Sequence, residues 1–230
     1  MKSTMDIYLF MGAPGSGKGS LAQLCVQELG WKQLSTGNLC RKHISEGTKI
    51  GKEIDFFIKS GKLVPDELVT AMVVEWLDQE ANDTTPIILD GFPRTRVQAE
   101  ALDKELGKSE RWNLKIINLV IDDEAVVKRL SHRFICKNKE CQAIYSLDPD
   151  CILLGDNGIV CEVCQEKLCR RKDDKPEAIR ERLAIYHKHE DSLLQYYRDK
   201  GYRIVDLEAQ QPLPETFEDF KRIAGSDTAS

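Results

Sequence analysis

The run Gly12-Ala13-Pro14-Gly15-Ser16-Gly17-Lys18-Gly19-Ser20 constrains this chain more than any other segment. It fits the phosphate-loop pattern G-x-x-x-x-G-K from Gly12 to Lys18. Residues 7–11 before it are apolar and predict a buried strand, and apolar residues recur after it at helical spacing. A glycine-rich turn between strand and helix brings backbone N–H groups close to phosphates, and the lysine adds a full charge. The sequence therefore predicts a phosphate-binding site on an α/β fold, and a plain glycine-rich turn with a surface lysine is the alternative.

Five short apolar runs predict the strands of a parallel sheet, since helical patterns separate most of them. The runs are residues 7–11, 31–34, 86–89, 114–121 and 202–205. In such a sheet, ligands bind at the carboxyl ends of the strands. Gly12, Thr36, Asp90 and Asp122 fall at these ends, so we expect the site there.

Two stretches interrupt the alternation of strands and helices. Residues 35–64 contain two helical segments separated by glycines, which predicts a small helical lobe. Residues 136–169 are rich in Cys, Gly, Asp and Asn and predict a small β-rich insert before a long helix at 177–200. For a chain of 230 residues we expect one core domain (1–34, 65–131 and 175–230), a helical lobe (35–64) and a β-rich insert (132–174).

The charge and hydropathy of the chain argue against some classes of partner. The net charge of −5 disfavours a dedicated nucleic-acid binder. No apolar run has the length of a membrane span, and the first residues lack a signal-peptide pattern, so we expect a cytoplasmic protein. An anionic substrate must then be held by local clusters of cations, which are Arg129 with Arg133, and Arg170 with Arg171 and Lys172. A solvated surface charge is the alternative for any single arginine.

Six of the eight cysteines fall between residues 136 and 169. Cys136 with Cys141 and Cys161 with Cys164 form two close pairs separated by a 19-residue loop. Two such pairs can make a four-thiolate site of the kind that zinc prefers. Unliganded thiols and disulfides are the alternatives, and Cys151 and Cys169 are spare thiols that can replace a ligand. The two cysteines outside the cluster, Cys25 and Cys40, fit small buried hydrophobic positions on helices.

The form G-A-P-G-S-G-K-G-S, with Gly19 where most phosphate loops carry Ser or Thr, resembles adenylate kinases and related nucleoside monophosphate kinases. The resemblance continues through Ser35-Thr36-Gly37, Gly61-Lys62-Leu63-Val64, Leu89-Asp90-Gly91-Phe92-Pro93-Arg94 and Arg171-Lys172-Asp173-Asp174, and it covers nearly the whole chain. It implies a monomeric P-loop enzyme with a three-layer fold, a five-stranded parallel sheet and a zinc-binding lid. It also implies reversible phosphoryl transfer from Mg·ATP to AMP, giving two ADP.

The resemblance assigns roles to individual residues. The residues matched to ATP binding are Gly15, Ser16, Gly17, Lys18, Gly19, Ser20, Arg129, Arg133, Ile144 and Tyr145. Those matched to AMP binding are Thr36, Arg41, Lys62, Leu63, Val64, Gly91, Phe92, Pro93, Arg94, Gln98, Arg171 and Arg182. Lys18, Arg94, Arg133, Arg171 and Arg182 match the residues around the transferring phosphoryl group. Asp90 matches a magnesium ligand that acts through water, and Gln98 matches the residue that reads the adenine edge. Asp173 and Asp174 match residues that orient Arg171 and Arg182, and a simple hinge-cap role is the alternative for them.

One position departs from the family pattern, because Asn38 stands where Asp is common. Asparagine keeps the hydrogen bonds and removes a negative charge, which affects acceptor affinity rather than the reaction. Related kinases with another base, such as a GTP:AMP phosphotransferase or a UMP/CMP kinase, are the nearest alternatives, and the long lid disfavours the UMP/CMP type. A zinc-ribbon module that binds nucleotide without turnover is the alternative from another class.

Overall fold

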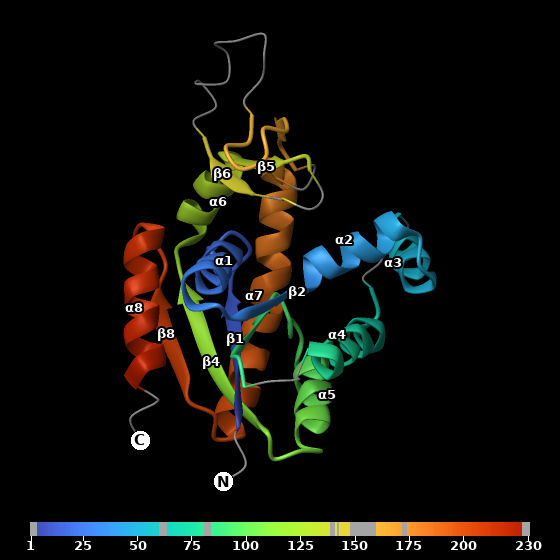
Figure 1. Cartoon of the computed structure of the whole chain (residues 1–230), viewed down its shortest axis with the longest axis vertical. Helices are drawn as coiled ribbons and strands as arrows, with labels where there is room; N and C mark the ends of the chain where they lie inside the picture. The colour runs from blue at the N-terminus through green and yellow to red at the C-terminus, as the bar shows by residue number, and fades with distance from the viewer. Residues whose placement is uncertain are drawn as a thin grey trace.

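The computed structural model of the chain describes residues 4–59, 64–80, 84–138, 141, 143–147, 160–171 and 174–226. Its centre is a parallel sheet of five strands in the order β2-β3-β1-β4-β8 (Figure 1). The strands are β1 (Met5–Gly12), β2 (Lys32–Ser35), β3 (Ile87–Asp90), β4 (Trp112–Val120) and β8 (Ile204–Glu208). The predicted fold class, a parallel α/β sheet with a phosphate loop after the first strand, is confirmed.

The register of the sheet places the predicted site residues at one edge. Phe10 of β1 pairs with Asp90 of β3, and Ser35 of β2 pairs with the same aspartate. Gly12 ends β1 opposite Leu119 of β4. Because parallel strands bring their carboxyl ends together, the loops after β1, β2 and β3 meet at this edge.

Alternating residues of β1 fill two hydrophobic layers, as the period of a strand requires. Ile7 and Leu9 pack with α4 (Asp66–Glu80), α5 (Arg96–Leu106) and α7 (Pro176–Asp199). Tyr8 and Phe10 face the opposite layer, which α1 (Lys18–Leu29) and α8 (Leu213–Ser226) cover. All four side chains are at most 2% exposed, and the sheet is therefore a rigid base for the loops at its edge.

The predicted helical lobe consists of α2 (Thr36–Glu46) and α3 (Lys49–Lys59), which extend away from the sheet in Figure 1. Gly47 ends α2 in the left-handed conformation, with φ of 65°. A Cβ atom at Gly51 would lie 2.0 Å from the His43 carbonyl oxygen, so only glycine lets α3 approach α2 this closely. The two helices form a tight pair through this contact.

The predicted β-rich insert lies at one end of the molecule (Figure 1). It follows α6 (Asp123–Ser131) and contains an antiparallel sheet in the order β6-β5-β7. The strands are β5 (Arg133–Cys136), β6 (Ile144–Ser146) and β7 (Leu168–Cys169). Ala13 and Leu130 pack with Ile179 and Leu183 of α7, so a small apolar cluster joins the base of the insert to the phosphate loop.

The observed strands differ from the predicted ones mainly at their ends. β8 continues to Glu208, beyond the apolar run at 202–205, and the strand includes Asp206, which pairs with Asn118 of β4. The Asp206 carboxylate accepts a hydrogen bond of 2.8 Å from Asn118 Nδ2 on this neighbouring strand. A polar pair between neighbouring strands can thus extend a strand past its apolar residues. Among the described residues, no helix is both long enough and apolar enough to cross a membrane.

Candidate active site

The phosphate loop requires glycine at three positions with positive φ. Gly12, Gly15 and Gly17 have φ values of 130°, 87° and 102°. A Cβ atom at Gly12 would lie 2.5 Å from the Leu119 carbonyl oxygen, and one at Gly15 would lie 2.8 Å from Leu130. The loop therefore packs directly on β4 and α6, and its glycines are demanded by both dihedral angle and space.

Lys18 is the first residue of α1 and points back into the loop. Its Nζ donates to the carbonyl oxygens of Gly12 and Ala13 at 2.7 Å each, and to Ser16 Oγ at 3.2 Å. Burial lowers the pKa of Lys18 to about 8, Asp90 opposes this shift, and the positive charges of Arg94 and Arg182 add to it. Lys18 is therefore a desolvated amine near two arginines and one carboxylate, and an anion that pairs with it would favour its charged form.

Asp90 ends β3 directly beside the start of α1. A Cβ atom at Gly19 would lie 3.3 Å from Asp90 Oδ2, so the glycine that follows the lysine leaves room for this carboxylate. Carboxylate oxygens are ligands that Mg²⁺ accepts, either directly or through water. The position of Asp90 next to the phosphate loop fits a metal that accompanies a bound polyphosphate.

The turn after β3 joins the phosphate loop to α2. Gly91 has φ of 80°, and a Cβ atom there would lie 2.9 Å from Arg94 Nη2. Its carbonyl oxygen accepts hydrogen bonds from Arg94 Nε at 2.7 Å and Thr36 Oγ1 at 2.9 Å. Phe92 is 1% exposed and fixes the turn to the core, while Arg94 is exposed. The turn thus presents a guanidinium on a rigid backbone, with Pro93 buried behind it.

Gln98 is the first-turn residue of α5 matched above to adenine, and it is only 6% exposed. Its Oε1 accepts from the backbone N–H of Arg94 at 2.7 Å, and its Nε2 donates to Asp66 Oδ1 at 2.7 Å. Sequence reasoning missed Asp66. Its sequence signal was slight: an acidic residue at the start of a helix, a place where carboxylates are favoured for the helix dipole alone.

The remaining residues matched to the acceptor are only partly described. Arg41 of α2 is exposed, and its Nη2 donates to Asn38 Oδ1. Asn38, which departs from the family pattern, therefore contacts Arg41, the residue matched to the phosphate of the acceptor nucleotide. Val64 is half-buried before α4, while Lys62 and Leu63 lie outside the described residues.

Arg129 of α6 connects the phosphate loop to the loop between β8 and α8. Its guanidinium donates to the carbonyl oxygens of Ser16 at 3.4 Å, Gln210 at 3.1 Å and Gln211 at 3.3 Å. The sequence did not predict the hydrogen bonds to Gln210 and Gln211, because their backbone carbonyl oxygens, and not their side chains, accept them. Arg129 therefore links the phosphate loop to the loop between β8 and α8.

Two arginine side chains, Arg133 and Arg182, converge on Asp174 between the antiparallel sheet and α7. Arg133 begins β5, and its Nε and Nη2 donate to the two carboxylate oxygens of Asp174, with Nε–Oδ2 at 2.8 Å. Arg182 Nη1 lies 3.5 Å from Asp174 Oδ1. The backbone N–H of Asp174 donates to the Arg171 carbonyl oxygen at 3.2 Å. Asp174 thus pairs with Arg133 and Arg182, and Asp173 lies outside the described residues.

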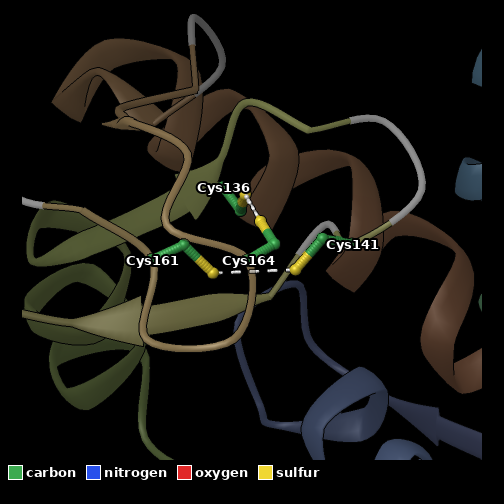
Figure 2. Close-up of side chains that lie close together, drawn as sticks. All are labelled: Cys136, Cys141, Cys161 and Cys164. Atoms are coloured by element: carbon green, nitrogen blue, oxygen red, sulfur yellow. Dashed lines mark hydrogen bonds between the residues drawn. The ribbon is translucent and has the colours of Figure 1, made fainter.

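Figure 2 shows that the four predicted cysteines point toward one another. All four Sγ atoms lie within 4.8 Å of each other. The closest contacts join one cysteine from each pair, Cys136 to Cys164 at 3.3 Å and Cys141 to Cys161 at 3.6 Å. These separations exceed a disulfide bond and approach the sulfur–sulfur edge of about 3.8 Å in a tetrahedral zinc–thiolate site. The cluster therefore fits one zinc ion.

Tyr145 contacts the cysteine cluster, whereas the spare thiol of Cys169 lies outside it. Cys169 lies in β7 outside the cluster, and Cys151 falls outside the described residues. The Tyr145 hydroxyl lies 3.2 Å from Cys161 Sγ and accepts from the Glu162 N–H at 2.9 Å. Burial raises the pKa of Cys161, but hydrogen bonds from Tyr145 and the backbone outweigh this effect, and the pKa falls to about 6. Tyr145 is thus attached to the cysteine cluster, and its neighbour Ile144 is half-buried.

The comparisons with known proteins agree with this geometry. The family model described as adenylate kinase matches residues 10–202. The adenylate kinase of Archaeoglobus fulgidus is 38% identical over 218 residues, which cover 94% of this chain and 96% of the relative. That of Methanosarcina acetivorans is 37% identical over 219 residues, or 95% and 98% of the two chains. That of Borreliella burgdorferi is 40% identical over 207 residues, or 90% and 92%. The chain therefore belongs to the adenylate kinase family and is a phosphotransferase of adenine nucleotides.

Proposed function

We propose that this enzyme transfers the γ-phosphoryl group of Mg·ATP to AMP, giving two ADP, and that the reaction is reversible. The observation that carries the proposal is the position of Lys18, which is held in the phosphate loop by the carbonyl oxygens of Gly12 and Ala13. There it lies within electrostatic reach of Arg94 and Arg182, with Asp90 as the opposing charge. Like charges repel at short range, so such a cluster is stabilised when a polyanion lies between them. Two nucleotides that share one transferring phosphoryl group supply that polyanion.

The reaction forms one bond and breaks one bond. A phosphate oxygen of AMP attacks the γ-phosphorus of ATP as the bond to the β–γ bridging oxygen breaks, and ADP leaves. A phosphate anion needs no general base, so the work of the protein is positioning, charge stabilisation and exclusion of water. The loop at Gly15, Ser16, Gly17, Lys18, Gly19 and Ser20 holds the ATP phosphates, and Arg94 and Arg41 hold the AMP phosphate. Arg133, Arg171 and Arg182 stabilise the charge on the transferring group.

Magnesium accompanies the ATP phosphates and neutralises part of their charge. Asp90 is the residue that we propose to hold it through water, because its carboxylate lies beside the start of α1. No larger side chain at residue 19 competes for that space.

The two bases occupy opposite sides of the phosphate loop in this proposal. Arg129, with Ile144 and Tyr145 from the lid, contacts the donor adenine. The AMP-binding residues are Thr36, Arg41, Lys62, Leu63, Val64, Gly91, Phe92, Pro93, Arg94 and Gln98, together with Arg171 and Arg182. The hydrogen bonds of Thr36 and Arg94 to one carbonyl oxygen support this assignment, because they join α2 and the turn after β3 into one surface.

We also propose a division into three domains: a core of residues 1–34, 65–131 and 175–230, an AMP-binding lobe at 35–64, and a lid at 132–174. Closure of the lobe and lid would keep water from the phosphoryl group. Zinc bound by Cys136, Cys141, Cys161 and Cys164 would stabilise the lid, which has few apolar residues. Thiolate ligands must stay reduced, which supports a cytoplasmic location. In this proposal the enzyme acts in adenine nucleotide homeostasis as a monomer, without a nucleic-acid or membrane partner.

A substrate panel tests this proposal. Purified protein is supplied with ATP or GTP as donor and with AMP, GMP, CMP or UMP as acceptor, with and without Mg²⁺. We expect turnover with ATP and AMP only when Mg²⁺ is present, and a loss of several orders of magnitude in Lys18→Ala. Equal use of all four monophosphates, or full turnover in Lys18→Ala, would contradict the assignment.

A further inference from the structure

The Gln98 side chain is held at both ends of its amide group. The backbone N–H of Arg94 donates to Oε1 at 2.7 Å, and Nε2 donates to Asp66 Oδ1 at 2.7 Å. The second carboxylate oxygen of Asp66 accepts from Thr95 Oγ1 at 2.9 Å. Thr95 in turn caps α5 by accepting the Gln98 backbone N–H at 3.2 Å. Asp66 is therefore fixed by a closed network across α4 and α5.

These partners determine which end of the amide is oxygen and which is nitrogen. A backbone N–H can only donate, and a carboxylate can only accept. Rotating the Gln98 amide by half a turn would place two donors opposite each other at Arg94 and two acceptors opposite each other at Asp66. A buried polar group left without a partner is costly, so the flipped amide is strongly disfavoured.

Within the part of the chain that the structure describes, one donor and one acceptor of the Gln98 amide remain for a ligand. Its Nε2 keeps a second hydrogen, and its Oε1 keeps a second lone pair. This pair matches the edge of adenine, whose N6 amino group donates and whose N1 accepts. Hypoxanthine and guanine present the opposite pattern, an accepting O6 and a donating N1–H. A flipped amide would match them instead.

We propose that Asp66 is a specificity-determining positioning residue that locks Gln98 in the orientation required for a 6-amino purine and against a 6-oxo purine. This inference rests on the proposed function, in which Gln98 contacts the acceptor base. Asp66 acts through Gln98. Asp66 thus determines which atom of the Gln98 amide donates to the base and which accepts from it. The size of the base is selected by the other residues of the proposed acceptor site.

Three acceptors of one size test the lock in the unaltered enzyme. AMP satisfies both groups of Gln98, purine riboside 5′-monophosphate satisfies Nε2 alone through N1, and IMP opposes both. The lock predicts that kcat/KM falls in the order AMP, purine riboside monophosphate, IMP. An amide free to rotate would pair with both groups of IMP, so IMP would exceed purine riboside monophosphate, and that order would overturn the proposal.

The second test changes Asp66 alone. In Asp66→Asn the new side chain can donate as well as accept, so the flipped amide loses one of its two mismatches. We expect the preference for AMP over IMP, measured by competition in one mixture, to fall about 10-fold or more. Competition cancels any loss of folded enzyme. Glu67→Gln is the matched control, because it removes the same charge from the next, exposed residue of α4 and should leave the preference unchanged.

A double variant separates positioning from a general structural effect. In a Gln98→Leu background there is no amide to orient, so Asp66→Asn should no longer change the ratio of AMP to IMP use. An equal change in both backgrounds would overturn the proposal, as would an unchanged ratio in Asp66→Asn alone. If the unaltered enzyme phosphorylates none of the three acceptors, the proposed function itself fails, and the two failures are thus distinguishable.

Discussion

Arg133 and Asp174 form a two-point ion pair that joins the start of β5 to the residues just before α7. The guanidinium of Arg133, at the first position of β5, donates through Nε and Nη2 to the two carboxylate oxygens of Asp174, just before α7. The Asp174 side chain is 2% exposed and also lies 3.5 Å from Arg182. One buried carboxylate therefore sets the positions of two arginines that we assign to the transferring phosphoryl group.

The Asp174→Asn variant tests this pair. Removing one partner of a buried ion pair leaves an uncompensated charge, so we expect a loss of about 3 kcal/mol of stability. Because Arg133 and Arg182 lose their common partner, kcat should also fall, by about 10- to 100-fold, at temperatures where the variant is folded. Glu177→Gln, an exposed change in the first turn of α7, is the control for charge. A variant with lower stability but unchanged kcat would show that Asp174 is only structural.

Lys18 predicts a proton uptake on nucleotide binding. Its pKa lies near 8 in the free protein, below the ordinary value of 10.5, so the side chain is largely neutral at pH 8.5. A polyphosphate favours the charged form and raises the pKa, so binding of ATP should take up a proton at pH 8.5 and much less at pH 6.5. Calorimetry in two buffers of different ionisation enthalpy measures this uptake. Lys18→Met should abolish it, and an equal uptake in that variant would assign the proton to another group.

Asn38 predicts a change in acceptor affinity. In Asn38→Asp the new carboxylate would form an ion pair with Arg41, whose guanidinium already donates to this position. The added charge also repels the AMP phosphate, at a cost of about 1 kcal/mol in a solvated setting. The KM for AMP should therefore rise about 5-fold, less at high salt, with the KM for ATP unchanged. The control is Ser45→Asp, which places the same charge at another exposed position on α2. An equal rise in the KM for AMP in this control would show that the effect does not depend on the contact with Arg41.

The four-cysteine cluster predicts one zinc per chain. Replacing Cys161 and Cys164 with serine should reduce bound zinc to a trace and lower the midpoint of thermal unfolding by about 10 °C or more, since metal binding supplies much of the folding energy of a small insert. Cys169→Ser in β7 should change neither quantity. Elemental analysis and a thermal melt provide the measurements. Substoichiometric zinc in the unaltered protein, with no iron in its place, would contradict the prediction.

The fold was predictable because its strongest signals are local. The glycines at 12, 15 and 17 have positive φ, and the apolar runs alternate between two faces of the sheet. The end of β8 was missed, because the Asn118 side chain that pairs with Asp206 comes from a strand far away in the sequence. The cysteine cluster was predictable from spacing, although the spacing does not say that each close contact joins the two pairs.

The site was harder to predict where a residue acts through another residue. Lys18 comes after β1 and Asp90 ends β3, so their proximity is a consequence of the sheet. Asp66, by contrast, follows no strand, and its bond to Gln98 joins two helices that the sequence does not place side by side. Likewise, the sequence expectation for Asp174 did not include its pairing with Arg133.

The destination of the phosphoryl group is the most direct test of the account. ATP labelled in its γ-phosphoryl group is incubated with the enzyme, Mg²⁺ and AMP, and the label is followed into ADP and inorganic phosphate. The account predicts that each AMP consumed yields two ADP, one of them labelled, and that little label appears as inorganic phosphate even when AMP is absent. Label released mainly as inorganic phosphate, at a rate independent of AMP, would contradict the account.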